Sequence, residues 1–294
     1  MSAATLSFDD ALLRDVSRSF YLTMRWLPEP MQPAIALGYL LARATDSVAD
    51  TSQAAPEVRR AALLLMRAAV TEQADSDALE RLFMLLSGAL AQAQKNPAEY
   101  RLLRRFGDCL AAMAERPEAE RRLLAEVLDT IITAQIQDVD APCLEHEEDT
   151  LRYADAVAGC VGVFWTRLGY ATMGTAFAES AKAALMEQAG LRYGRGLQLV
   201  NMLRDEEEDA ARGRRYLAEA GRELWCDRAE RYLRDGLDYA RRLRSFRLRL
   251  TTSLPALLGL KTLRLLRQRK GSERVKISRA AVYMSLFTAC CKAI

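Results

Sequence analysis

The placement of proline is the feature that most constrains the fold of this chain. Pro56, Pro97, Pro117 and Pro142 each stand where one helical pattern of apolar residues stops and another begins. Proline is tolerated in the first turn of a helix but breaks a helix interior, so these positions mark helix boundaries. No stretch shows sustained strand alternation bounded by turn signals. The sequence therefore predicts an all-α protein.

The predicted helices run between these breaks and cover most of the chain. Their expected ranges are 8–19, 31–50, 57–73, 77–94, 99–115, 118–139, 150–170, 179–209 and 223–250. Segments 33–45, 157–169 and 197–203 have few polar positions and are expected to be central. No Ser- or Gly-rich linker divides the chain and no period repeats. We therefore expect one helical domain over residues 1–294, with 251–294 as its C-terminal helices.

The single histidine, His146, argues against several classes of enzyme. Histidine-based nucleophile triads and multi-histidine zinc sites each need a neutral imidazole as base or ligand. The six cysteines show no CxxC or metal spacing, which suits thiols in a reducing cytoplasm. If the chain is an enzyme, its charge chemistry comes from carboxylates, Arg, Lys and Tyr.

Charge and hydropathy indicate where the protein works. A formal net charge of +3 does not by itself indicate nucleic-acid binding. The arginine-dense region 192–279 is either a set of solvated helix faces or a contact with phosphates or an anionic membrane surface. The N-terminus lacks signal-peptide features, and the apolar terminal segment is shorter than the roughly 20 residues of a spanning helix. We expect a cytoplasmic protein, either free in the cytoplasm or in peripheral contact with the inner membrane face.

Two aspartate pairs carry the chemistry that the sequence predicts. Asp46 and Asp50 end one apolar segment, and Asp205 and Asp209 end another. Carboxylates four residues apart lie on one helix face, where a bridging divalent cation relieves their repulsion. Mg²⁺ prefers such hard oxygen donors. Exposed helix ends with ordinary Asp and Arg pairs are the alternative, because roughly one such spacing is expected by chance.

The residues around the two pairs are similar, which favours a shared function. Before Asp46, helical steps place Tyr39 and Arg43 on nearly the same stripe. Around Asp205 stand Gln198, Asn201, Arg204, Arg212, Arg214 and Arg215. Carboxylates with Mg²⁺ can grip a diphosphate while arginines bind its remaining oxygens, and an apolar interior can receive a hydrocarbon. The predicted reaction begins by ionising an allylic carbon.

The motifs in these segments resemble those of the squalene and phytoene synthase family, the head-to-head prenyl transferases. The four matching segments, in the family's order, are VSRSFYLTMRWLP (16–28), GYLLARATDSVAD (38–50), YADAVAGCVGVF (153–164) and QLVNMLRDEEEDAARGRRYL (198–217). The resemblance implies a single-domain isoprenoid-synthase-type helical bundle around a central apolar cavity. Its substrates would be two prenyl diphosphates.

The resemblance also implies a role for each matching residue. The four aspartates would bind Mg²⁺ that bridges to substrate diphosphate. The implied catalytic residues are Tyr39, Arg43 and Tyr153, with Tyr153 as the candidate proton acceptor and a packed, satisfied tyrosine as the alternative. The implied substrate contacts are Arg18, Ser19, Arg43, Gln198, Asn201, Arg204 and Arg214. Gly159 and Gly162 would allow close helix approach.

The C-terminal third indicates a branch of the family, which divides chiefly by whether the cyclopropyl intermediate is reduced. Segments 253–263 and 274–282 are similar to the C-terminal region of squalene synthases, where basic residues contact NADPH. Lys276 and Arg279 would bind this cofactor here. Two positions depart from that pattern: Ser278 replaces an arginine, and Thr251 stands near a phenylalanine position.

The expected activity follows from this branch. Two farnesyl diphosphates would condense to presqualene diphosphate with Mg²⁺, and NADPH would then reduce the rearranged cation to squalene. The alternatives are phytoene, dehydrosqualene or hydroxysqualene as product, or a stop at presqualene diphosphate. A non-catalytic helical scaffold is the alternative outside enzymes.

Overall fold

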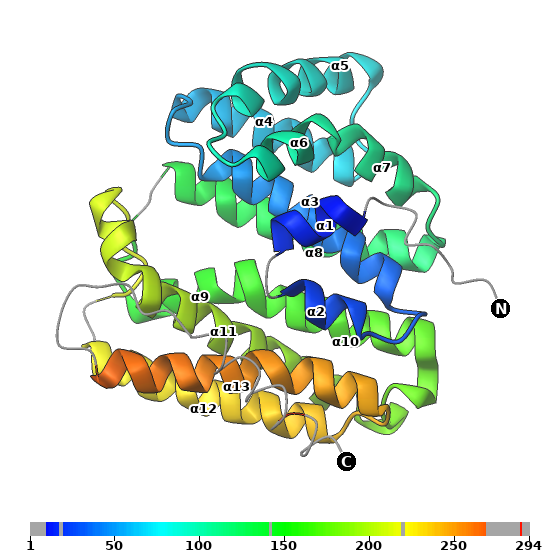
Figure 1. Ribbon diagram of the computed structural model, residues 1–294, viewed down its shortest axis with the longest axis vertical. Helices are drawn as coiled ribbons and strands as arrows, with labels where there is room; N and C mark the ends of the chain where they lie inside the picture. The colour runs from blue at the N-terminus through cyan, green and yellow to red at the C-terminus, as the bar shows by residue number, and fades with distance from the viewer. Residues whose placement is uncertain (1–9, 18–19, 141–142, 219–220, 269–288, 290–294) are drawn as a thin grey trace. The chain divides into compact units, whose positions relative to one another are not determined.

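The computed structural model describes residues 10–17, 20–140, 143–218, 221–268 and 289, and every regular element among them is a helix (Figure 1). One isolated bridge joins Cys143 to Arg215. The all-α prediction is therefore confirmed. The chain divides into two compact units, residues 1–25 with 29–140, and residues 26–28 with 141–294. The single domain and the central cavity stay predictions.

The first unit is built around a buried helix, α3 (Gln32–Ala49). Pro33 lies in its first turn, and the residues facing inward are mostly small or aliphatic; Leu40, Leu41 and Ala44 are at most 1% exposed. The prediction that segment 33–45 is central to its unit is thus confirmed. The other elements of this unit are α1 (Asp10–Ser17), α2 (Phe20–Arg25), α4 (Pro56–Val70), α5 (Ser76–Leu85), a π-helical turn η1 (Leu86–Leu90), α6 (Pro97–Arg104), α7 (Phe106–Ala114) and α8 (Glu118–Asp140).

In the second unit, α11 (Ala183–Ala211) packs against α10 (Cys160–Met173) and against both α12 (Arg222–Arg241) and α13 (Phe246–Gln268). Leu199 and Leu203 of α11 are fully buried with Trp225 and Leu233 of α12. The remaining elements are α9 (Glu147–Ala154), a π-helical turn η2 (Asp155–Gly159) and the short 3₁₀ turns η3 (Gly174–Ala176) and η4 (Ser180–Lys182). Segment 197–203 is mostly buried, as predicted, whereas 157–169 is only partly so.

Several predicted helices are interrupted, and the predictions of continuous helices there are wrong. The range 223–250 divides because α12 ends at Arg241 and α13 begins at Phe246. Between them Leu243 is buried, and the backbone N–H of Arg244 donates to the carbonyl oxygen of Phe177 at 2.9 Å. This tertiary hydrogen bond replaces a helical one, so the chain turns at a place where the charge pattern continues.

Two interruptions lie in the first unit. The range 99–115 divides at Arg105, whose φ and ψ of −102° and 14° leave the helical region. The range 77–94 contains η1, inside which Gly88 has φ −94° and ψ −112°. A helix with such a kink cannot present one continuous apolar stripe. The periodicity of the sequence does not detect either break.

Much of the arginine-dense region is engaged in ion pairs within the second unit. Arg267 of α13 pairs with Glu223, Asp227 and Glu230 of α12 at 2.8, 2.5 and 2.5 Å. These pairs link mostly exposed carboxylates of α12 to α13, as expected of charged, solvated helix faces. None of the helices within the described residues is long and apolar enough to cross a membrane.

Candidate active site

The first aspartate pair lies at the C-terminal end of α3. Asp46 is in the last turn, and Asp50 caps the helix, its backbone N–H donating to the carbonyl oxygen of Asp46 at 2.9 Å. Gln135 of α8 donates its Nε2 to Oδ1 of Asp46 at 2.5 Å. Burial, and after it the charge of Asp50, raise the pKa of Asp46 to about 6. One sheltered and one exposed carboxylate thus repel each other, which a bound cation would relieve.

Arg43 and Tyr39 precede this pair on α3, and the side chain of each donates a hydrogen bond to another element of the same unit. Arg43 donates its Nη2 to Oε1 of Glu99 at 2.6 Å. Burial lowers the pKa of Arg43, but the charges of Glu99 and Asp46 outweigh burial and hold that pKa above its usual value. Tyr39 donates its hydroxyl to the carbonyl oxygen of Val16 at 3.1 Å. The guanidinium is therefore held near the aspartates in its charged form.

Glu99 and Gln135 contact Arg43 and Asp46 respectively, although no sequence motif predicted a role for them. Glu99 follows the helix N-cap Asn96 by three residues, and Asn96 donates its Nδ2 to Oε1 of Glu99 at 3.1 Å. That spacing is typical of a capping box, so the sequence could have indicated Glu99 as a residue of the helix N-terminus. Gln135 lies 89 residues from Asp46 in the sequence, so no local pattern connects them. Its Oε1 is buried without a hydrogen-bond partner in the described part of the chain.

The second aspartate pair lies at the C-terminal end of α11 in the other unit. Arg204 donates to both carboxylate oxygens of its neighbour Asp205, from Nε at 2.9 Å and from Nη2 at 2.5 Å. This hydrogen bonding is the main cause that raises the pKa of Arg204. One turn earlier, Asn201 donates its Nδ2 to Oε1 of Gln198 at 3.4 Å. The predicted polar residues of this helix therefore do lie together.

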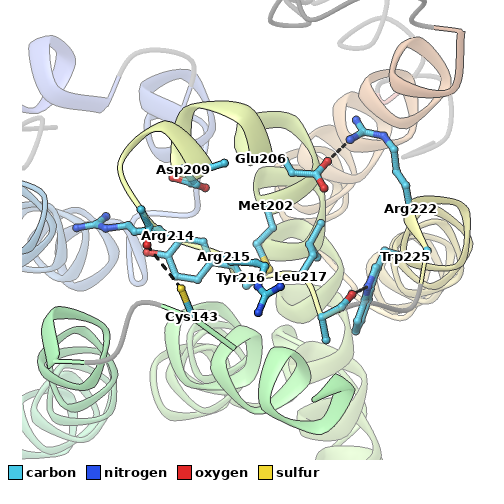
Figure 2. Close-up of a pocket in the computed structure, with 14 residues that line it drawn as sticks. Cys143, Met202, Glu206, Asp209, Arg214, Arg215, Tyr216, Leu217, Arg222 and Trp225 are labelled. Carbon is cyan, nitrogen blue, oxygen red and sulfur yellow. Dashed lines mark hydrogen bonds and ion pairs between the residues drawn. The ribbon is translucent and has the colours of Figure 1, made fainter. Parts of the chain in front are cut away.

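A pocket of about 540 Å³ opens beside Asp209 (Figure 2). Its walls are the last turns of α11, the segment 213–218 and the first turn of α12. Glu206 of α11 and Arg222 of α12 form an ion pair across it. Arg214 lines the same pocket as Asp209. An aspartate of the second pair and a predicted diphosphate-binding arginine thus share one concave surface.

The donor chemistry of both pairs fits Mg²⁺. This ion usually takes one or two protein carboxylates and completes its shell with water and substrate phosphates. Each pair offers two carboxylates beside a guanidinium. Nowhere among the described residues do three or more acidic, histidine or cysteine side chains gather as a metal cluster. Phosphate oxygens and water would have to supply the remaining ligands.

Tyr153, at the end of α9, stacks on Tyr216 with ring centroids 5.0 Å apart and planes at 16°. One turn earlier, the buried hydroxyl of Thr150 donates to the carbonyl oxygen of Tyr216 at 2.9 Å and accepts from the N–H of Ala218 at 3.2 Å. Helix α9 thus holds the segment that carries Arg214. The sequence motifs predicted a role for Tyr153 but for neither Thr150 nor Tyr216.

Replacement of Thr150 by valine is expected to destabilise the protein by about 1–3 kcal/mol, because the shape is kept while the N–H of the buried Ala218 loses its acceptor. Urea denaturation measures the change. The matched control is Thr130→Val, since the exposed Thr130 donates only within its own helix. Equal stability of the Thr150 variant and the wild type would show that the hydrogen bonds of Thr150 to residues 216 and 218 contribute nothing to the free energy of unfolding.

Four predicted contact residues lie outside the described residues: Arg18, Ser19, Lys276 and Arg279. Their roles in substrate and NADPH binding stay predictions. Thr251, in contrast, is described, lies buried in α13 and donates its hydroxyl to the carbonyl oxygen of Arg247 at 2.8 Å.

The fold and the site define an all-α protein with two aspartate pairs beside arginines, and comparison with known proteins gives the family. The squalene/phytoene synthase family model matches residues 13–224. The presqualene diphosphate synthase of Rhodopseudomonas palustris is 33% identical over 204 residues, which cover 68% of this chain and 57% of that protein. The presqualene diphosphate synthase of Zymomonas mobilis is 30% identical over 202 residues, covering 68% and 56%.

The chain therefore belongs to the squalene/phytoene synthase family. The match spans little more than half the length of these curated relatives. Among solved structures, the complex of TcSQS with the ligand E5700 has a TM-score of 0.70 at 21% identity and covers 98% of this chain and 90% of that one. At that identity it supports the fold.

Proposed function

We propose that this chain is an Mg²⁺-dependent prenyl transferase that joins two farnesyl diphosphates head to head and yields presqualene diphosphate. The observation that carries this proposal is the presence of both aspartate pairs, each beside a guanidinium, inside the family match at 13–224. The relatives at 33% and 30% identity are presqualene diphosphate synthases, which favours this product over the squalene expected from the C-terminal third.

The proposed reaction uses charge rather than a nucleophile of the protein. The bond between C1 and oxygen of one farnesyl diphosphate breaks, and the diphosphate leaves with the electron pair. Mg²⁺, when bound, neutralises the charge that develops on this leaving group. Arg204 and Arg214 of the second unit, and separately Arg43 of the first unit, are each proposed to bind diphosphate oxygens in bidentate fashion. Because guanidinium groups stay protonated at any working pH, this assistance does not depend on a titrating base.

The carbon–carbon step then needs a proton acceptor. The double bond of the second farnesyl diphosphate attacks the allylic cation, and loss of one proton closes the cyclopropane of presqualene diphosphate. We assign this proton to Tyr153, whose hydroxyl oxygen would accept it while passing its own proton on. The balance is one new diphosphate ester, one pyrophosphate and one proton.

Reduction to squalene is the second candidate, favoured by the similarity of segments 253–263 and 274–282 to squalene synthases. Lys276 and Arg279 would contact the NADPH phosphates. Because both lie outside the described residues, this step rests on the sequence alone.

Incubation of the purified protein with farnesyl diphosphate and Mg²⁺ tests both candidates. We expect pyrophosphate release that requires Mg²⁺, and presqualene diphosphate as the product with or without NADPH, identified by mass spectrometry. Squalene formed only with NADPH would instead support the second candidate. If neither farnesyl nor geranylgeranyl diphosphate releases pyrophosphate, the prenyl transferase proposal is wrong.

A further inference from the structure

The helix that carries Tyr153 changes its geometry two residues after it. The π-helical turn η2 (Asp155–Gly159) joins α9 to α10. A π turn accommodates an extra residue, is less regular than an α-helix and recurs at functional sites. The extra residue rotates α9 relative to α10 about the helix axis. The direction in which Tyr153 points therefore depends on the shape of this turn.

The first residue of the turn is held by an arginine of α11. Arg195 donates to both oxygens of Asp155, from Nε at 2.7 Å and from Nη2 at 2.5 Å. The two side chains are only 18% and 27% exposed. The third nitrogen, Nη1, donates to the hydroxyl of Tyr232 at 3.1 Å, and the guanidinium lies 5.2 Å from the centre of that ring. Such a forked, stacked guanidinium fixes orientation as well as charge.

The last residue of the turn leaves room for this ion pair. A Cβ atom on Gly159 would lie 2.9 Å from Oδ1 of Asp155 and 3.3 Å from the carbonyl oxygen of Leu191 on α11. Any larger residue would therefore displace the carboxylate or push α11 away. The expectation that Gly159 permits close helix approach is confirmed, and here the approach also serves Asp155.

Asp155 is poorly placed to act as a base itself. Both of its oxygens accept hydrogen bonds from Arg195, and its negative charge faces a positive one. Its position suits support of a neighbouring group better than chemistry of its own.

We infer that Asp155 and Arg195 form a positioning pair that holds the π-helical turn and thereby aims Tyr153 at the reacting carbocation. Arg195 lies one turn before Gln198 on α11, the helix that also carries Asp205 and Asp209. The pair thus connects the helix that holds the diphosphate to the residue that handles the proton. This inference rests on the proposed function.

Steady-state kinetics and binding on three variants test this inference. Asp155→Asn removes one charge, Arg195→Lys removes the fork but keeps the charge, and Gly159→Ala keeps both side chains but displaces the carboxylate. Each is expected to lower kcat about 10- to 100-fold, because small misplacements of a reacting group cost about that much. The affinity for Mg²⁺ with inorganic pyrophosphate, measured by calorimetry, is expected to stay within twofold, since neither aspartate pair is altered.

Two further measurements separate positioning from general stability. The double variant D155N/R195K is expected to lose no more kcat than the worse single variant, because all changes break one interaction. Hydrogen exchange of the backbone amides 155–160 is expected to become faster in every variant. The matched control is Arg192→Lys. Arg192 lies three residues before Arg195 on α11 and pairs with Asp235 of α12 at 3.1 Å. This substitution is expected to leave kcat and the hydrogen exchange of the turn unchanged.

The outcomes are distinguishable. Two results with an active wild type would overturn the inference of a positioning pair and leave the proposed function intact. One is an unchanged kcat in the variants, and the other is a loss of pyrophosphate affinity as large as the loss of kcat. A wild type that releases no pyrophosphate would overturn the proposed function and this inference with it. Slower turnover with faster exchange of amides 155–160 and intact pyrophosphate binding supports the pair.

Discussion

Replacement of Asp205 by asparagine is expected to slow Mg²⁺-dependent pyrophosphate release about a thousandfold or more. Asparagine keeps the size of the side chain but removes the charge that a hard cation requires. It also deprives Arg204 of the carboxylate that it binds at 2.9 and 2.5 Å. A thousandfold loss corresponds to about 4 kcal/mol of transition-state stabilisation, the size expected when a metal can no longer be held at the leaving group.

The measurement is the initial rate of pyrophosphate release over a series of Mg²⁺ concentrations. Partial recovery at high Mg²⁺ is expected, because Asp209 and the substrate would still offer oxygens. Asp227→Asn is the matched control, since Asp227 is an exposed carboxylate that pairs with Arg267 on a different helix. A rate within threefold of wild type for the Asp205 variant would contradict a metal-binding role.

The two aspartate pairs were predictable because their chemistry is local. Residues four apart on a helix share a face, so Asp46 with Asp50 and Asp205 with Asp209 follow from spacing alone. Arg204 directly precedes Asp205 in the sequence, so its place beside the second pair follows in the same way. The relative positions of residues within one turn of the same helix can be predicted without knowing the rest of the fold.

The partners that hold these groups were not predictable by the same argument. Gln135 reaches Asp46 from a helix 89 residues away, and Arg195 reaches Asp155 across 40 residues. No periodicity links such positions, because helix packing decides which residues meet. The break between α12 and α13 was missed for a related reason: a hydrogen bond from Arg244 to Phe177 ends the helix where the sequence pattern continues. Only Ser245, a favoured N-cap residue before Phe246, offered a signal.

The second large effect is expected from Gly162→Ala, at the contact between α10 and α11. A Cβ atom at this position would lie 1.9 Å from the carbonyl oxygen of Gly190, far inside van der Waals contact. The obstacle is the backbone of α11, which cannot rotate away as a side chain could. The helices must therefore separate, and nearby buried groups such as Thr166, bonded to Tyr239 at 2.8 Å, lose their packing. We expect destabilisation of about 3 kcal/mol or more.

Far-UV circular dichroism during urea denaturation measures this change, because the helices of both units contribute to the signal. The matched control is Gly107→Ala on α7, where the new methyl group would meet only the ring of Phe83 at 3.4 Å. That control is expected to be neutral or stabilising by up to about 1 kcal/mol, since alanine favours helix more than glycine does.

A Gly162→Ala protein as stable as wild type would contradict direct backbone contact between α10 and α11. The expected loss of stability also has a functional consequence. Because Asp205 and Asp209 are carried by α11 while Tyr153 precedes the turn that leads into α10, separation of these two helices moves the proposed Mg²⁺-binding carboxylates away from the proposed proton acceptor. Turnover should therefore fall even under conditions in which the variant remains folded, whereas the Gly107 control should keep full activity.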